Sequence, residues 1–115
     1  MNYDPLPNDA LDALEKAEQL KLQGKHEEAI TLLEELLISD PANVPALEEL
    51  ADNELSLNRF ARAEAAADRA ITLDQGSYMG HYILGFLRSQ ESKWPEALVE
   101  LTLANKLRAN NPGIL

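Results

Sequence analysis

The chain has 115 residues, 45% of them hydrophobic, so it can bury the core of one domain or of a short array of repeats. Its 20 acidic and 10 basic residues give a net charge of -10, which argues against nucleic acid and anionic membrane surfaces as partners. It contains no cysteine, which excludes disulfides, thiolate zinc sites and cysteine nucleophiles.

Six helices are predicted along the chain, because apolar residues recur at steps of three and four and no strand-like alternation occurs. Their expected ranges are about 9–22, 26–38, 45–57, 60–73, 78–90 and 95–109. The connections between them have only a few residues, so neighbouring helices should be antiparallel. The sequence therefore predicts an all-α fold.

The predicted helix ends coincide with capping and turn residues. Asn8 or Asp9, and later Ser77, offer N-caps, since short polar side chains accept hydrogen bonds from the first backbone N–H groups of a helix. Gly24 and Asn58 are expected to take the left-handed conformation that ends many helices.

A pattern of residues repeats every 34 positions, which indicates a repeat of helix pairs. Small residues recur in register because a close crossing of two helices leaves room only for alanine or glycine. The sets in register are Ala17, Ala51 and Gly85; Ala29, Ala63 and Ala97; Leu33, Ala67 and Leu101; Leu36, Ala70 and Ala104; and, at the turns inside the pairs, Gly24, Asn58 and Ser92.

This repeat resembles the tetratricopeptide repeat (TPR) over roughly residues 10–111. The stretches that carry the resemblance are Gly24-Lys25-His26-Glu27-Glu28-Ala29-Ile30, Asn58-Arg59-Phe60-Ala61-Arg62-Ala63, and Leu84-Gly85 with Trp94-Pro95-Glu96-Ala97-Leu98. The resemblance implies a right-handed α-solenoid of three antiparallel helix pairs. It implies one domain over residues 1–115, with repeats at about 10–43, 44–77 and 78–111. Glu54 and Arg88 depart from the family's pattern, which has an apolar residue at their position, so we expect local changes in packing there.

No active site is expected. His26 and His81 lie in different repeats, at positions where the resemblance implies half-buried packing residues. The carboxylate pairs at 27–28, 34–35 and 48–49 are interpreted as solvated faces, because adjacent helical residues point in different directions. The sequence holds no glycine-flanked nucleophile, phosphate-binding loop or calcium loop. We therefore expect no catalysis, no metal and no cofactor.

The TPR resemblance implies instead a concave groove, lined by the first helix of each pair, in which peptides or partner helices lie. Carried over by position, the groove is expected to present Leu11, Leu14, Glu18, Lys21, Glu48, Asp52, Leu55, Met79, Tyr82, Phe86 and Ser89. One TPR subclass binds a C-terminal carboxylate through Lys and Asn side chains, but here Glu18 and Asp52 replace the asparagines. The predicted partner is therefore a protein or peptide with a basic or amphipathic segment, and an acidic tail is unfavourable.

Tyr82 and Phe86 allow two interpretations. They lie four residues apart on one helical face with Met79 one turn earlier, which suits an apolar side chain or an amphipathic helix in the groove. They suit equally a contact with a further helix that caps the array.

Charge is distributed unevenly along the chain. Residues 1–43 carry 10 acidic and 3 basic residues, residues 44–77 carry 7 and 3, and residues 78–115 carry 3 and 4. After residue 109 too few residues remain for a capping helix, although residues 111–115 could open one, so the apolar residues of the last helix are expected to be partly uncovered. We expect either that the chain was cut from a longer one, which we favour, or that it self-associates through its C-terminal repeat.

Three functions fit these observations, and groove binding is favoured. The alternatives are a chaperone for a secreted protein, since small three-repeat TPR chaperones are similar in size and acidity, and a structural or self-assembly spacer of a larger protein. No apolar run approaches the roughly 20 residues of a membrane-spanning helix. The start of the chain, Met1 to Pro5, has neither the basic end nor the apolar stretch of a signal peptide, so we expect a cytoplasmic location.

Overall fold

The structure, a computed structural model, describes the backbone of residues 6–109 and the side chains of residues 12–109. That part of the chain forms six α-helices and no strand, as predicted. The helices are α1 (Leu6–Leu22), α2 (His26–Ser39), α3 (Val44–Ser56), α4 (Phe60–Leu73), α5 (Tyr78–Gln90) and α6 (Trp94–Ala109). The Leu11 side chain and the tail after residue 109, for which predictions were made, lie outside the described residues.

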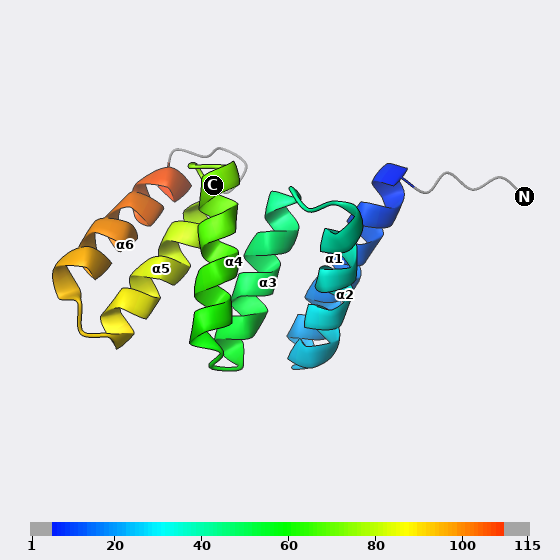
Figure 1. Cartoon of the computed structure of the whole chain (residues 1–115), viewed down its shortest axis with the longest axis horizontal. Helices are drawn as coiled ribbons and strands as arrows, with labels where there is room; N and C mark the ends of the chain where they lie inside the picture. The colour runs from blue at the N-terminus through cyan, green and yellow to red at the C-terminus, as the bar shows by residue number, and fades with distance from the viewer. Residues whose placement is uncertain (1–5, 110–115) are drawn as a thin grey trace, which may run out of the picture.

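The helices form three pairs, α1/α2, α3/α4 and α5/α6, which follow one another along the long axis of the molecule (Figure 1). The molecule measures 56 × 30 × 23 Å. The first helices touch one another, since α3 contacts both α1 and α5. Within residues 6–109, no Cα atoms of α2 and α4 lie within 8 Å of one another, and the same holds for α4 and α6, so the second helices fan apart. This solenoid of helix pairs therefore curves with α1, α3 and α5 on its inner, concave side, as expected.

Small residues form much of the core, as their 34-residue spacing predicts. Most of the buried apolar residues form two clusters, and α3 contributes to both. The first consists of Ala17, Ala29, Leu33, Leu37, Ala46, Leu47 and Ala70. The second consists of Ala51, Ala63, Ala66, Ala67, Ile83, Leu84 and Leu87. With so many alanines, the helix backbones approach closely, and leucine and isoleucine fill the remaining space between pairs.

The turns inside the pairs use the left-handed backbone conformation. Gly24 has a φ of 77°, and Asn58 and Ser92 both have a φ of 61°. Ser77 caps α5, because its side chain accepts a hydrogen bond from the backbone N–H of Gly80 at 3.0 Å. These features confirm the predicted ends at Gly24, Asn58 and Ser77.

The prediction for the start of the first helix was wrong. Helix α1 already begins at Leu6, so Asn8 and Asp9 lie inside it and neither is its N-cap. Pro7 falls in the first turn, where a helix loses nothing from the missing N–H group. The sequence therefore contained two signals for the helix start. Asn8 and Asp9 favoured a start after them, and Pro7 favoured the earlier start that the structure shows.

The charged residues at the apolar position late in α3 and α5 are accommodated by ion pairs. Glu54 is 2% exposed and its carboxylate lies 3.5 Å from Nη1 of Arg59, the residue that also pairs with Glu27 on α2. Arg88 lies 2.9 Å from the carboxylate of Glu64 on α4. Because Glu54 pairs with Arg59, the N-cap residue of α4, and Arg88 pairs with Glu64 within α4, the departures from the repeat pattern leave the fold intact.

Helices α5 and α6 cross closely at Gly85 and Leu101. A Cβ atom at Gly85 would lie 2.6 Å from Cγ and Cδ2 of Leu101 and 3.2 Å from its backbone N. In register, the second pair has Ala51 where the third has Gly85, and Ala67 where it has Leu101. In the second and third pairs, the size of the residue on the first helix thus balances the size of the residue at the matching position of the second helix.

This balance predicts a strong coupling between the two positions. Gly85→Ala should lower the free energy of unfolding by about 1–3 kcal/mol, because it overpacks the crossing. In a Leu101→Ala background, which reproduces the Ala51 and Ala67 pair, the same glycine substitution should be neutral or should stabilise by up to about 1 kcal/mol through helix propensity. Urea unfolding of the four proteins measures the coupling. An equal loss in both backgrounds would contradict the steric account.

Candidate functional site

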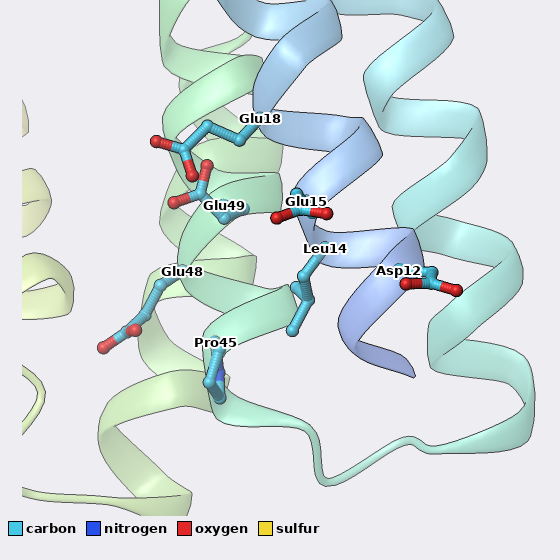
Figure 2. Close-up of a pocket in the computed structure, with 7 residues that line it drawn as sticks. All are labelled: Asp12, Leu14, Glu15, Glu18, Pro45, Glu48 and Glu49. Carbon is cyan, nitrogen blue, oxygen red and sulfur yellow. The ribbon is translucent and has the colours of Figure 1, made fainter. Parts of the chain in front are cut away.

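A hollow of about 570 Å³ opens between α1 and α3, and five of its seven lining residues are acidic (Figure 2). We call it the acidic hollow; it is lined by Asp12, Leu14, Glu15, Glu18, Pro45, Glu48 and Glu49. The side chains of Glu18 on α1 and Glu49 on α3 point toward one another across it (Figure 2). No basic residue lines the hollow, so it attracts cations.

Lys21 lies next to this hollow and partly neutralises it. Its ammonium Nζ donates to Glu49 at 3.0 Å and to Asp52 at 3.1 Å, so one lysine joins α1 to two carboxylates on α3. Burial opposes the charged form, but the hydrogen bonds and charges of Glu49 and Asp52 prevail and raise the pKa of Lys21. Lys21 is therefore held by the protein itself, and Asp52 has less charge to offer a partner than its sequence position implies.

Glu48 is the most unusual carboxylate of the hollow. It is half-buried, and its Oε2 accepts a hydrogen bond of 2.6 Å from the hydroxyl of Ser77, the N-cap of α5. In Figure 2 its side chain extends away from α1. Burial raises the pKa of Glu48, and the charges of Asp74 and Glu49 add to this effect, while the Ser77 hydrogen bond opposes it. A cation placed beside Glu48 would relieve this cost of burying a negative charge.

The acidic hollow unites three of the predicted groove residues, Leu14, Glu18 and Glu48, with four that the sequence analysis missed. The missed residues are Asp12, Glu15, Pro45 and Glu49. The interpretation of residues 48–49 as a solvated face was wrong, because both are partly buried and hydrogen-bonded between helices. The adjacent acidic residues at 27–28 and 34–35 are exposed, as expected. The sequence did contain one signal for this site. Leu14, Glu18 and Lys21 recur at helical spacing on one side of α1, and this side faces the residues of α3 that line the hollow or pair with Lys21.

The remaining groove residues lie further along the concave side. Leu55, Met79 and Phe86 are half-buried and pack against the second core cluster, so each offers only part of its side chain to a ligand. Ser89 donates its hydroxyl hydrogen to the backbone oxygen of Phe86 at 2.6 Å. Tyr82 is 51% exposed, but it lines a different hollow with residues of α6.

Both histidines make hydrogen bonds inside the protein. Nδ1 of His26 lies 2.9 Å from Oδ1 of the fully buried Asn53 on α3. His81 is buried, with Nδ1 at 2.7 Å from a carboxylate oxygen of Glu100 and Nε2 at 3.2 Å from the carbonyl oxygen of Gln75. Both rings thus serve packing between helices. In the described part of the chain no cluster of three or more His, Asp or Glu residues has the geometry of a metal site, and no helix is long and apolar enough to cross a membrane.

The double ion pair of Lys21 yields a prediction about stability. Lys21→Gln should lower the free energy of unfolding by roughly 1 kcal/mol at low salt, because it leaves Glu49 and Asp52 facing each other without a cation. Added salt should reduce the loss by screening that repulsion. Lys16→Gln, an exposed lysine on the same helix, is the matched control. Equal losses in the two variants would show that the ion pair contributes nothing.

Comparison with known proteins identifies similar repeats. A model of the tetratricopeptide repeat matches residues 20–79, just over half of the chain. The first TPR domain of human RPAP3 has a TM-score of 0.79 and 28% identity, over 91% of this chain and 83% of that one, and the same values hold for the first TPR of RPAP3 bound to the HSP90 peptide SRMEEVD. The type III secretion translocator chaperone SycD of Yersinia enterocolitica has a TM-score of 0.84 and 18% identity, over 96% of this chain and 84% of that one. A search of curated protein sequences finds no significant match.

Proposed function

Because the chain belongs to the tetratricopeptide repeat family, we propose that it is a non-catalytic module that binds a protein or peptide segment in its concave groove. The segment lies across α1, α3 and α5, whose inner faces form one continuous surface. The single observation that carries the proposal is the acidic hollow, which gathers five carboxylates and no base at the entrance to that surface.

The chemistry of the hollow favours a ligand with basic residues. Asp12, Glu15 and Glu18 are exposed and form no ion pair with any residue from 12 to 109, so their charge is available to a partner. Glu48 and Glu49 lie deeper and are partly buried. An arginine or lysine side chain entering the hollow would meet both groups and gain charge-assisted hydrogen bonds.

The ligand should also carry apolar residues. Leu14 lines the hollow, and Leu55, Met79 and Phe86, further along the chain of inner helices, are partly exposed. A segment with basic residues at one end and leucine or an aromatic residue further along matches this order. Such a segment is amphipathic. An α-helix with anchor residues at three- and four-residue steps would place all of them on the one face that contacts the groove.

An acidic peptide is the contrasting case. The peptide seen with the first TPR of RPAP3, SRMEEVD, contains two glutamates and an aspartate. In this chain Glu18 and Asp52 would repel such a peptide. Although the fold is shared, we therefore propose a ligand of opposite charge.

Two alternatives and a location remain proposals. A chaperone for a secreted protein would use the same groove, and the match to SycD, at 18% identity, supports the fold of such a protein and no more. A structural spacer would need no groove ligand at all. The non-catalytic role is supported by the engagement of both histidines within the protein, and a cytoplasmic location stays a prediction from the sequence.

The binding proposal is tested with two synthetic amphipathic peptides, one pairing arginine with leucine and one with each arginine replaced by glutamate. Isothermal titration should show binding of the arginine peptide only, weakening with salt. Glu15→Lys with Glu18→Lys should reduce that affinity about tenfold or more, since ~1.4 kcal/mol is a factor of ten.

The matched control is Glu28→Lys with Glu35→Lys, which changes the net charge equally but lies on the exposed surface of α2. This control should bind nearly as well as the wild type. Equal losses in the two double variants would mean that overall charge, not the acidic hollow, attracts the peptide. Binding of neither peptide would favour the spacer.

The raised pKa of Glu48 gives a pH-dependent prediction. At pH 7 the folded protein holds this carboxylate ionised against the cost of burial, so Glu48→Gln should raise the free energy of unfolding by on the order of 0.5 kcal/mol. Below the ordinary pKa of about 4.5 the glutamate is protonated in both folded and unfolded chains, and the gain should vanish. Glu28→Gln, at an exposed site, is the control for urea unfolding at both pH values. A gain that persists at low pH would show that charge burial is not its cause.

A further inference from the structure

Each helix pair contacts the next through its second helix, which packs against the first helix of the following pair. His26 on α2 hydrogen-bonds Asn53 on α3, the first helix of the next pair, at 2.9 Å. Glu64 on α4 pairs with Arg88 on α5, again the next first helix, at 2.9 Å. The outward side of each second helix is therefore a docking surface for the helix that follows.

The last pair presents this docking surface with no described residue covering it. Trp94 stands 68 positions after His26, and Leu98 stands 34 positions after Glu64. They are 61% and 67% exposed, and Tyr82 on α5 is 51% exposed. Further along α6, a hollow of about 220 Å³ is lined by Tyr78, Tyr82, Leu101, Ala104, Asn105 and Arg108. We call these residues, with Trp94 and Leu98, the end face.

The opposite end of the solenoid is built differently. The positions of α1 that correspond to docking residues are Asp12, Glu15, Lys16 and Gln19, all exposed. In register, α3 has Ala46, Glu49, Leu50 and Asn53, and α5 has Gly80, Ile83, Leu84 and Leu87. A polar α1 closes the N-terminal end against further stacking, so head-to-tail assembly would bury carboxylates against Trp94 and Leu98.

Charge favours joining two end faces. The third of the chain that forms the end face has 3 acidic and 4 basic residues, whereas residues 1–43 have 10 and 3. Two copies related by a two-fold axis through the end face keep their strongly acidic ends far apart. Within α6, Glu96 lies in the first turn and Lys106 and Arg108 lie in the last. An antiparallel α6 pair therefore places opposite charges and opposite helix dipoles beside each other.

We propose that the end face binds the end face of a second copy of this chain, forming a two-fold symmetric dimer with the α6 helices antiparallel. Centred on Leu101, this arrangement sets Trp94 of one copy opposite Arg108 of the other, a favourable pairing of a cation with an aromatic ring. Leu98 and Tyr82 then fill the adjoining hollow of the partner copy. The acidic hollow stays free in both copies, so dimerisation and groove binding are independent.

Sedimentation equilibrium of the whole chain over a wide range of concentrations tests the proposal. The average mass should rise from 12.7 kDa toward twice that value. Leu98→Glu should keep the protein monomeric, because the two-fold axis would bring two glutamates into the interface, and the native Glu64 shows that the repeat accepts glutamate at this position. Val99→Glu is the matched control: Val99 is 66% exposed, but it lies on another side of α6 and should still dimerise.

Trp94 gives a second readout, because it is the only tryptophan of the chain. Its fluorescence emission should shift to shorter wavelength as the wild type dimerises and stay unchanged with concentration in Leu98→Glu. A wild type that remains monomeric at all concentrations would overturn the proposal, and so would equal behaviour of the two glutamate variants. A dimer whose formation leaves the Trp94 emission unchanged would place the interface elsewhere and equally reject the end face.

Discussion

The close approach of two helix backbones at small residues is the constraint on which the rest of this structure depends. In the third pair, Leu101 packs so tightly onto Gly85 that even a methyl group would collide with it. The first two pairs meet the same requirement with Ala17 and Ala51 at the fully buried crossings. Because the two helices of each pair pack closely, the first helices of successive pairs contact one another. These contacts create the concave side that carries the proposed site.

Several hydrogen bonds and ion pairs join one helix pair to the next, and they shape the groove. Asn53 is fully buried with partners on α2 and on its own helix, and Lys21 joins α1 to α3 through two carboxylates. Glu48 reaches across to the cap of α5. Most of these polar groups already have partners within the fold. The carboxylates of the acidic hollow that pair with no residue from 12 to 109 are Asp12, Glu15 and Glu18, and these define what a ligand can recognise.

The sequence was sufficient for the fold but not for the detail of the site. The 34-residue register of alanines and glycines determined the helix pairs, and Gly24 and Asn58 marked the turns, because these features act locally. The site depends on side chains from different helices. The sequence predicted a solvated Glu49 and an Asp52 available to a ligand. In the structure, Lys21 of α1 donates hydrogen bonds to both carboxylates.

Tyr82 shows the same limit at the other end of the molecule. Its position along α5 fitted both the groove and a capping contact, and only the packing of α5 on α6 placed it in a hollow with Leu101 and Arg108. The helical periodicity of one segment cannot decide between two surfaces that meet along it. The packing of the next helix decides, and Gly85 allows Leu101 of α6 to approach α5 closely.

The most direct test of the central claim maps where a cationic amphipathic peptide binds. Amide chemical shifts of isotope-labelled protein would be followed by NMR while the arginine and leucine peptide is added. The account predicts that the largest changes fall on the inner faces of α1 and α3, around Glu18 and Glu48, and extend toward Leu55. Changes confined to α2, α4 or the end face, or the same changes with the glutamate peptide, would contradict it.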